Sequence, residues 1–335
     1  MFVNKRVQTS VRLAVGLALA VLLVAVAQVH IAHAAGTANT LKVSPVRSDI
    51  EVKPGSVKVV PTTVTNLTKD AITVRPIEND FVSGDQSGTP AIILDSDGYA
   101  PSHSLKRFMT PIADVTIPGG QSKTINVIIT VPNNAQAGGY FGAIRFAPTA
   151  GDSGGQVNLS ASVASLILLT VPGDIIEKID MTGFDVEQDN TPGTSFPNGN
   201  GLQATVRFQN KGNVQIGPFG KVSVKKGDKV IYETDFNNKD QRDMILPDSL
   251  RLWNIPLQNV DGFGQYTVIA TFTYGAKNQT IEVTKSFWII PPSVVIGAIV
   301  AIFVLIGLVI ATIFFIRARR SKRPSFNRAR HGRRR

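Results

Sequence analysis

The chain has 335 residues, no cysteine and a formal net charge of +11. Without cysteine, disulfides and thiolate chemistry are excluded, so an exported domain must be stabilised by burial of a core. The charge lies at the ends: ten of the 35 basic residues follow Ile316 and three lie in the first twelve, which leaves 22 basic against 24 acidic residues between them. This nearly neutral middle lacks the basic surface that nucleic acids require, so no nucleic-acid partner is expected.

The first 34 residues have the pattern of a secretory signal peptide. Lys5, Arg6 and Arg12 precede an apolar stretch at 13–27, and Ala-His-Ala at 32–34 is typical of a cleavage site. We therefore expect residues 1–34 to be removed and the chain after Ala34 to be exported. An uncleaved N-terminal anchor is the alternative interpretation.

The stretch 40–172 predicts a first β-sandwich. Val57–Asn66 and Ala71–Asp80 flank a polar turn at the spacing of a hairpin. Ile125 to Val131 alternates apolar and polar residues, as a half-buried strand does. The glycine-rich run 138–142 then predicts a bulge or a tight turn into a strand.

The long strand expected from Val157 to Val171 contains an uninterrupted apolar run, Leu166 to Leu169. Such a run is typical of a strand that is buried on both faces or covered by a neighbouring domain. Pro172-Gly173 follows, and we expect the domain boundary there.

Residues 173–290 predict a second sandwich. Leu202 to Gln209 and Tyr266 to Tyr274 both alternate with period two. The halves also share a faint pattern: Val64-Thr65-Asn66 and Phe208-Gln209-Asn210 each precede a polar turn. We interpret this as two related modules in tandem.

The stretch 293–316 carries no charge and is long enough, at about 36 Å as a helix, to cross a hydrocarbon core of about 30 Å. The basic tail, 317–335, follows it and predicts a cytoplasmic C-terminus, with the sandwiches outside. Trp288 is expected near the lipid headgroups, and the helix and tail make membrane lipid a partner. A buried core helix is the alternative.

Several segments of the exported part resemble a family of bacterial cell-surface proteins. These segments are Val52-Lys53-Pro54-Gly55, Ile117-Pro118-Gly119-Gly120-Gln121-Ser122 and Gly139-Tyr140-Phe141-Gly142. In order and spacing they resemble the WxL-interacting proteins. The resemblance implies two immunoglobulin-like domains, a membrane anchor, and binding of peptidoglycan or surface-protein partners. The expected fold is thus an all-β ectodomain of two tandem immunoglobulin-like sandwiches with one C-terminal transmembrane helix.

Catalytic and metal-binding motifs are absent from the sequence, so we expect a non-enzyme without a cofactor or metal. One loop offers acceptors, a ring for stacking and a donor, and it is the candidate ligand site: Asp95, Asp97, Tyr99, His103 and Arg107. An ordinary turn with a loop histidine is the plainer interpretation of the same residues.

Three functions remain open at this point. The first is a membrane-anchored envelope protein that binds peptidoglycan or surface proteins. The second is an assembly accessory or chaperone that offers a sheet edge to exported clients. The third is a glycan hydrolase that uses paired carboxylates such as Asp95 and Asp97. The lack of a catalytic constellation favours the first.

Overall fold

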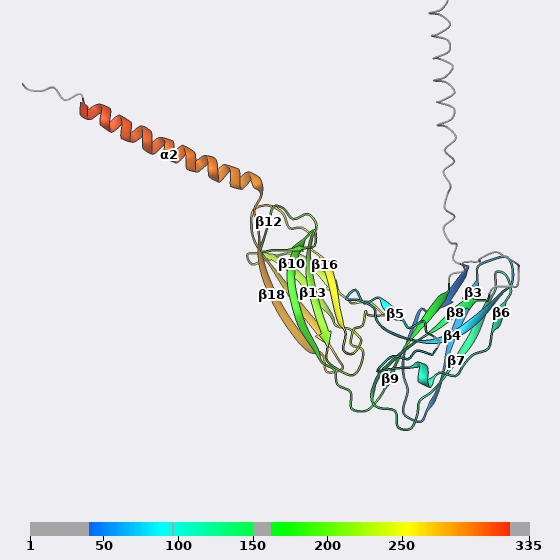
Figure 1. Ribbon diagram of the computed structural model, residues 1–335. Coiled ribbons are helices and arrows are strands. Elements are labelled where there is room, and N and C mark those ends of the chain that lie inside the picture. Colours follow the sequence, from blue (N-terminus) through cyan, green and yellow to red (C-terminus); the bar gives the residue numbers. More distant parts are fainter. Residues whose placement is uncertain (1–39, 96, 150–161, 322–335) are drawn as a thin grey trace, which may run out of the picture.

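The computed structural model describes residues 40–95, 97–149 and 162–321. Within these residues the chain forms two β-sandwiches, which meet at an angle, and a helix that extends from the far end of the second (Figure 1). The expected signal peptide, the start of the strand expected at Val157, and residues 322–335 of the basic tail lie outside the described residues.

The N-terminal sandwich consists of a three-stranded and a six-stranded sheet. The first sheet has the order β1 (Leu41–Ser44), β3 (Val57–Asn66) and β7 (Ser122–Thr130). The second has the order β2 (Arg47–Glu51), β9 (Val163–Val171), β8 (Gly138–Pro148), β4 (Ile72–Ser83) and β5 (Pro90–Ile92). Its sixth strand, β6 (Val115–Ile117), also pairs with β4. A short 3₁₀ helix, η1 (Lys106–Phe108), lies in the chain between β5 and β6. Only β2 and β9 pair in parallel among these strands.

The hairpin expected between the segments 57–66 and 71–80 is wrong. Both segments are strands, but β3 pairs with β1 and β7 whereas β4 pairs with β5, β6 and β8. The turn between them therefore crosses from one sheet to the other. Asn66 stabilises this crossing, because its side-chain amide donates to the carbonyl oxygens of Asp70 at 2.7 Å and Ile117 at 3.0 Å.

The alternation predicted for β7 is confirmed. Ile125, Val127 and Ile129 are buried in the core, and the residues between them are exposed. Because successive side chains of a strand point to opposite faces, one face of β7 can pack on the six-stranded sheet while the other remains in solvent.

The C-terminal sandwich has a four-stranded and a five-stranded sheet. The four strands have the order β11 (Thr191–Pro192), β10 (Ile179–Gln188), β13 (Leu202–Asn210) and β16 (Leu250–Pro256). The five have the order β12 (Ser195–Phe196), β18 (Gln279–Ile289), β17 (Gly264–Tyr274), β14 (Phe219–Lys226) and β15 (Lys229–Phe236). Phe208 and Phe272 meet edge to face at the centre, 5.1 Å between ring centroids, as the period-two patterns of β13 and β17 predict.

The apolar run of β9 is buried from both sides, as predicted. Ile167 and Leu169 belong to the core of the N-terminal sandwich, whereas Leu168 packs on the opposite face with Phe81 and Phe141. Met244 and Leu246 of the C-terminal sandwich pack against that second cluster. The clusters on both faces explain why β9 lacks polar alternation.

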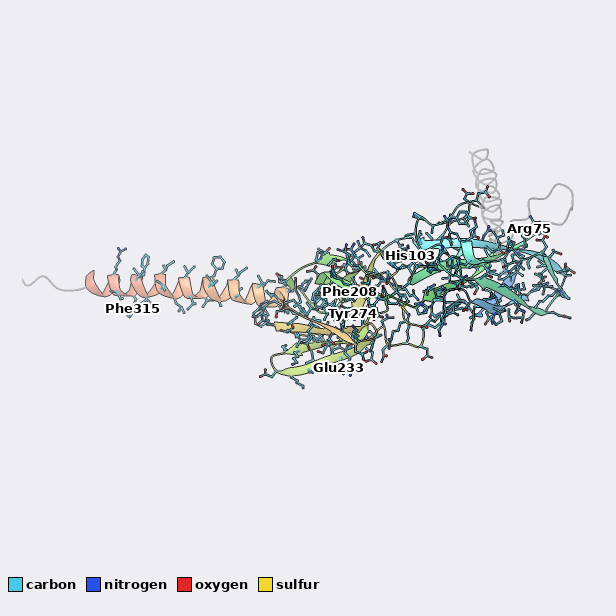
Figure 2. All side chains as sticks on the ribbon, turned by 90° about the horizontal axis from the view of Figure 1, so that it is seen from below. Arg75, His103, Phe208, Glu233, Tyr274 and Phe315 are labelled. Carbon is cyan, nitrogen blue, oxygen red and sulfur yellow. The ribbon has the colours of Figure 1, made fainter. Side chains whose placement is uncertain are left out.

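The helix α2 (Pro292–Ser321) contains an apolar stretch, Pro292–Arg317, that is long enough to cross a membrane. The side chains of residues 292–317, including Phe315, stand clear of both sandwiches, and none of the most apolar window of the helix is buried (Figure 2). This argues against the alternative of a buried core helix, because such a helix would be covered by the rest of the chain.

Candidate functional site

Three of the five predicted site residues lie close together. The Tyr99 ring stacks with the Arg107 guanidinium, 4.4 Å from the ring centroid, and with the ammonium of Lys106 at 4.7 Å. His103 and Arg107 line one hollow of about 640 Å³ at the surface. Tyr99 is thus held by cations and is half exposed, with a ring face already in use.

Asp95 and Asp97 do not join this group as a carboxylate pair. The Asp95 side chain accepts a hydrogen bond from the backbone N–H of Asp97 at 3.0 Å, and the carbonyl of Asp95 accepts one from Gly98. These contacts form an Asx-type turn, which is the plainer interpretation of the segment. Among the described residues no group of three or more His, Asp or Glu is placed to hold a metal ion.

A buried carboxylate that the sequence reasoning missed positions the whole loop. Asp80, on β4, is fully buried and accepts hydrogen bonds from the backbone N–H groups of Ala100 at 2.9 Å and Lys106 at 2.8 Å. The sequence carries little signal for this role, because β4 contains other polar residues, among them Arg75 and Glu78. Because a buried polar group is stable only when it is hydrogen-bonded, these two bonds tie the loop to β4.

The hollow beside the loop lies where the two sandwiches meet. His103 adopts a left-handed backbone conformation with φ of 59°, and its Nδ1 donates to the carbonyl of Gly139 at 2.5 Å. Tyr140 and Asn213 complete the opposite wall, and the hydroxyl of Ser104, which is almost fully buried, has no partner among the described residues. Burial raises the pKa of the Tyr140 phenol, so it stays protonated and remains a donor, to the carbonyl of Gln136.

The glycines of β8 lie at the same junction, and of the two interpretations of these glycines, a bulge or a tight turn into the strand, the bulge is not formed. The pairing of β8 with β9 runs without a register shift from Gly138 to Phe146. The N–H of Gly139 instead donates to the carbonyl of Asn213 at 2.8 Å, and a Cβ on Gly138 would lie 2.7 Å from that same oxygen. Glycine is required here because the backbone of the C-terminal sandwich approaches so closely.

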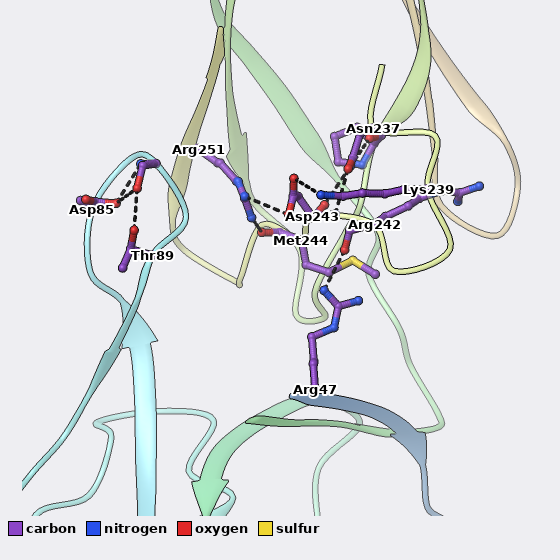
Figure 3. A network of polar contacts seen from close by, with 11 residues as sticks. Arg47, Asp85, Thr89, Asn237, Lys239, Arg242, Asp243, Met244 and Arg251 are labelled. Atoms are coloured by element: carbon purple, nitrogen blue, oxygen red, sulfur yellow. Dashed lines mark hydrogen bonds and ion pairs between the residues drawn. The ribbon is translucent and has the colours of Figure 1, made fainter. Parts of the chain in front are cut away.

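A second set of polar contacts joins the sandwiches on the other side of the junction. The Arg47 guanidinium, on β2, donates to the carbonyl of Arg242 at 2.8 Å (Figure 3). It also pairs with Asp49, and the Gln241 side chain donates to the carbonyl of Arg47. Arg251 is mostly buried; it donates to the carbonyl of Met244 and lies 3.3 Å from Asp243. Burial lowers the pKa of Arg251, although the guanidinium remains charged.

Several sheet edges are covered by the chain itself. The N–H of Leu252, on the outer strand β16, donates to the carbonyl of Gln86 in the β4–β5 turn at 2.6 Å. The carbonyl of Ile128 on β7 accepts from Thr110, and β2 is covered by Gln241. Unpaired edges attract other strands, so these contacts protect the protein from unwanted association.

The strand β15 is a largely open edge, which one side chain contacts: the Asn259 amide donates to the carbonyl of Ile231 at 3.4 Å. It has eight residues, it is the last strand of the five-stranded sheet, and within the described residues it pairs only with β14. Its side chains combine an exposed Val230 with charged Lys229, Glu233 and Asp235. Glu233 lies at the outer margin of the C-terminal sandwich (Figure 2).

Comparisons with known proteins give similarities of fold at low identity. The chain is similar to the class 5 fimbriae chaperone CfaA (14% identity, 75% of this chain and 99% of that chain, TM-score 0.38). It is also similar to the E. coli chaperone DraB (17%, 74% and 96%, 0.32) and to a chain of the Salmonella enterica SafA pilin–SafB chaperone complex (11%, 76% and 98%, 0.35). No family model and no curated protein matches.

These findings correct one expectation. The resemblance to WxL-interacting surface proteins is wrong, because the solved structures that match about three quarters of this chain include the fimbriae chaperone CfaA, the chaperone DraB and a chain of a pilin–chaperone complex, and none of these is a WxL-interacting protein. The peptidoglycan partner that the resemblance implied has no support from them. The short glycine and proline motifs that carried the resemblance serve turns and close backbone approach, which many sandwiches require.

Proposed function

We propose that this protein is a non-catalytic, membrane-anchored accessory of the cell envelope that holds exported polypeptides by adding one of their strands to its own sheet. The chaperone alternative thus becomes the preferred function. Exported polypeptides that have not yet assembled expose unpaired strand edges. A sheet that pairs with such an edge stabilises the polypeptide through backbone hydrogen bonds.

The open edge of β15 is the observation that carries this proposal. The chain covers the edges of β2, β7 and β16 in part with its own segments, whereas β15, eight residues long, has no second strand beside it among the described strands and only the Asn259 side chain on its outer edge, at the carbonyl of Ile231. Alternate residues of such a strand direct their N–H and C=O groups away from the sheet. Val230 provides an apolar contact for a client strand, and Lys229, Glu233 and Asp235 limit nonspecific pairing.

The orientation in the membrane is part of the proposal. α2 spans the bilayer, the sandwiches are extracytoplasmic, and the basic tail from Arg317 is cytoplasmic. A client that emerges from the membrane would then meet β15 close to the bilayer, because β15 belongs to the sandwich from which α2 extends. The loop of Tyr99, His103 and Arg107 is retained as a second contact for a client, on the hollow between the sandwiches.

The test uses the full chain and an immunoglobulin-like domain from which the last strand has been deleted. We expect this probe to stay soluble in the presence of the protein and to slow amide hydrogen exchange in β15. Two variants, Glu233→Pro and Thr234→Pro, remove adjacent N–H groups that point to opposite sides of the strand. The variant that loses the outward N–H should keep the wild-type melting temperature and lose the probe.

The matched control is proline at Lys123, an exposed residue of the strand β7, in the sandwich that the proposal does not use for pairing. If this variant folds, it should bind the probe like the wild type. Unchanged exchange in β15 when the probe is bound would overturn the assignment of this edge.

A further inference from the structure

The end of the C-terminal sandwich from which α2 extends carries two exposed aromatic side chains. Phe263, in the loop before β17, is 52% exposed, and Trp288, near the end of β18, is 39% exposed. Their ring centroids lie 6.1 Å apart. Together they form one wall of an open hollow of about 580 Å³, whose other residues include Thr194, Gln265 and Ser286.

The Phe263 loop is held in place rather than free. The Tyr266 hydroxyl donates to the carbonyl oxygens of Asp261 and Gly262, and it accepts from the ammonium of Lys226 at 2.9 Å. Tyr266 itself is fully buried and stacks on Phe287, and the neighbouring Val260 belongs to the core. Buried residues therefore hold a large apolar ring partly in solvent, an unfavourable position for such a ring unless something covers it.

The position of α2 determines what can cover this ring. Trp288 precedes Pro292, the first residue of the helix, by four residues, which corresponds to at most about 13 Å of extended chain. The apolar stretch Pro292–Arg317 is about 39 Å long as a helix and exceeds a hydrocarbon core of about 30 Å. A helix that is longer than the core tilts, and interfacial aromatic residues set the direction of the tilt.

We propose that Phe263 and Trp288 form a membrane-seating surface, in which both rings enter the headgroup region and hold the C-terminal sandwich against the bilayer. The occupant of the hollow is lipid. The polar residues around the rings, Thr194, Gln265 and Ser286, match the mixed polarity of that layer. The charges at this end include Asp261 as well as Lys226, so the rings, rather than net charge, supply the attraction.

This inference rests on the proposed membrane anchor and adds an orientation to it. With the sandwich seated, α2 tilts toward the side that bears Phe263, and β15 has a fixed height above the lipid. Trp253, buried in part in the core, and Trp288 are the two tryptophans of the chain, so tryptophan fluorescence can report on each position separately.

The test places the full chain in phosphatidylcholine–phosphatidylglycerol vesicles with brominated acyl chains, which quench tryptophan by contact. The variant Trp253→Phe leaves Trp288 as the only tryptophan and therefore as the reporter. In the double background Trp253→Phe/Trp288→Phe, the further change Phe263→Trp moves the reporter to the loop before β17. We expect both reporters to lose about half of their fluorescence or more, as interfacial aromatic residues should. A third reporter, Tyr99→Trp in the same double background, lies in the other sandwich and should not be quenched.

The outcomes distinguish a failure of the membrane-seating surface from a failure of the membrane anchor. Quenching at Trp288 without quenching at position 263 would overturn the seating surface and leave the anchor intact. Absence of quenching at both positions, together with no flotation of the protein with vesicles, would overturn the anchor and the seating surface together. Phe263→Asp in the Trp253→Phe background gives a further check: it should keep the melting temperature but reduce quenching of Trp288 at least twofold.

Discussion

Asn66 and Asn210 make the same hydrogen bonds at the same place in the two sandwiches. Each ends a central strand and is fully buried, and each donates to the carbonyl four residues later and to a carbonyl of another segment: Ile117 for Asn66, Ile245 for Asn210. Each side-chain oxygen accepts from the N–H two residues later. The faint sequence pairing of the halves thus corresponds to a shared structural device.

Asn66→Asp and Asn210→Asp should each destabilise their sandwich strongly. A carboxylate still accepts from the local N–H, but it cannot donate to the two carbonyls, and each buried group left unsatisfied costs about 1–3 kcal/mol. We therefore expect a loss of at least about 2 kcal/mol in the free energy of unfolding, measured by urea denaturation. Asn126→Asp, at an exposed position of β7, is the control and should change little.

Loss of the Asp80 carboxylate should release the Tyr99 loop. Asp80→Ala removes the acceptor for the N–H groups of Ala100 and Lys106, and it should lower stability by about 2–4 kcal/mol. Trypsin should then cut after Lys106 and Arg107 faster than in the wild type, as followed by mass spectrometry. Equal cleavage rates at these two bonds would show that Asp80 does not hold the loop.

The ion pairs of Asp243 predict a contribution to acid sensitivity. Burial acts to raise the pKa of this carboxyl, but the hydrogen bond from Lys239 and the charge of Arg251 outweigh it, so the pKa lies below its ordinary value. A carboxyl with a depressed folded-state pKa contributes stability that is present above its unfolded pKa, near 4, and is lost as pH falls through the folded value.

Asp243→Asn should therefore flatten the decrease in melting temperature between about pH 5 and pH 2, relative to the wild type. Part of the decrease should remain, because the pKa values of Asp85 and Asp114 are also lowered, by hydrogen bonds from Ser87 and Arg75. Asp97→Asn, in an exposed turn, serves as the control. An unchanged pH profile in Asp243→Asn would contradict the assignment.

Gly138→Ala should open the junction between the sandwiches. Its φ of 142° is strained for alanine, at about 1–3 kcal/mol, and its Cβ would lie 2.7 Å from the Asn213 carbonyl. We expect a larger radius of gyration by small-angle X-ray scattering. Gly120→Ala is the matched control, because it has a positive φ of 69° but nothing within 4 Å of the added Cβ. It should lose stability without opening the junction.

The sequence predicted strands well and their partners poorly. Period-two patterns such as Ile125-Val127-Ile129 indicate which face of a strand is buried, because the pattern is local. The turn after Asn66 has the same residue pattern whether it joins two strands of one sheet or crosses between sheets, so the predicted hairpin failed. Strand order, and with it the open edge of β15, depends on contacts between distant segments that no local pattern records.

The candidate site shows the same limit. Tyr99, His103 and Arg107 were grouped because they are close in sequence, and the structure places them around one region of the surface. The sequence around Asp80 does not reveal its role, since that role depends on a loop twenty residues away. Phe263 likewise gave no signal, because an aromatic residue between glycines is usually part of a core.

The β4–β5 turn of the N-terminal sandwich covers part of the edge of β16 in the C-terminal sandwich, because the Gln86 carbonyl accepts from the N–H of Leu252. Each sandwich therefore depends on the other for part of its surface. If either half were transplanted alone into another protein, it would carry an uncovered strand edge or a bare apolar face at Leu168 and Met244. Changes at this junction, in nature or in engineering, must therefore preserve the fit between the two halves.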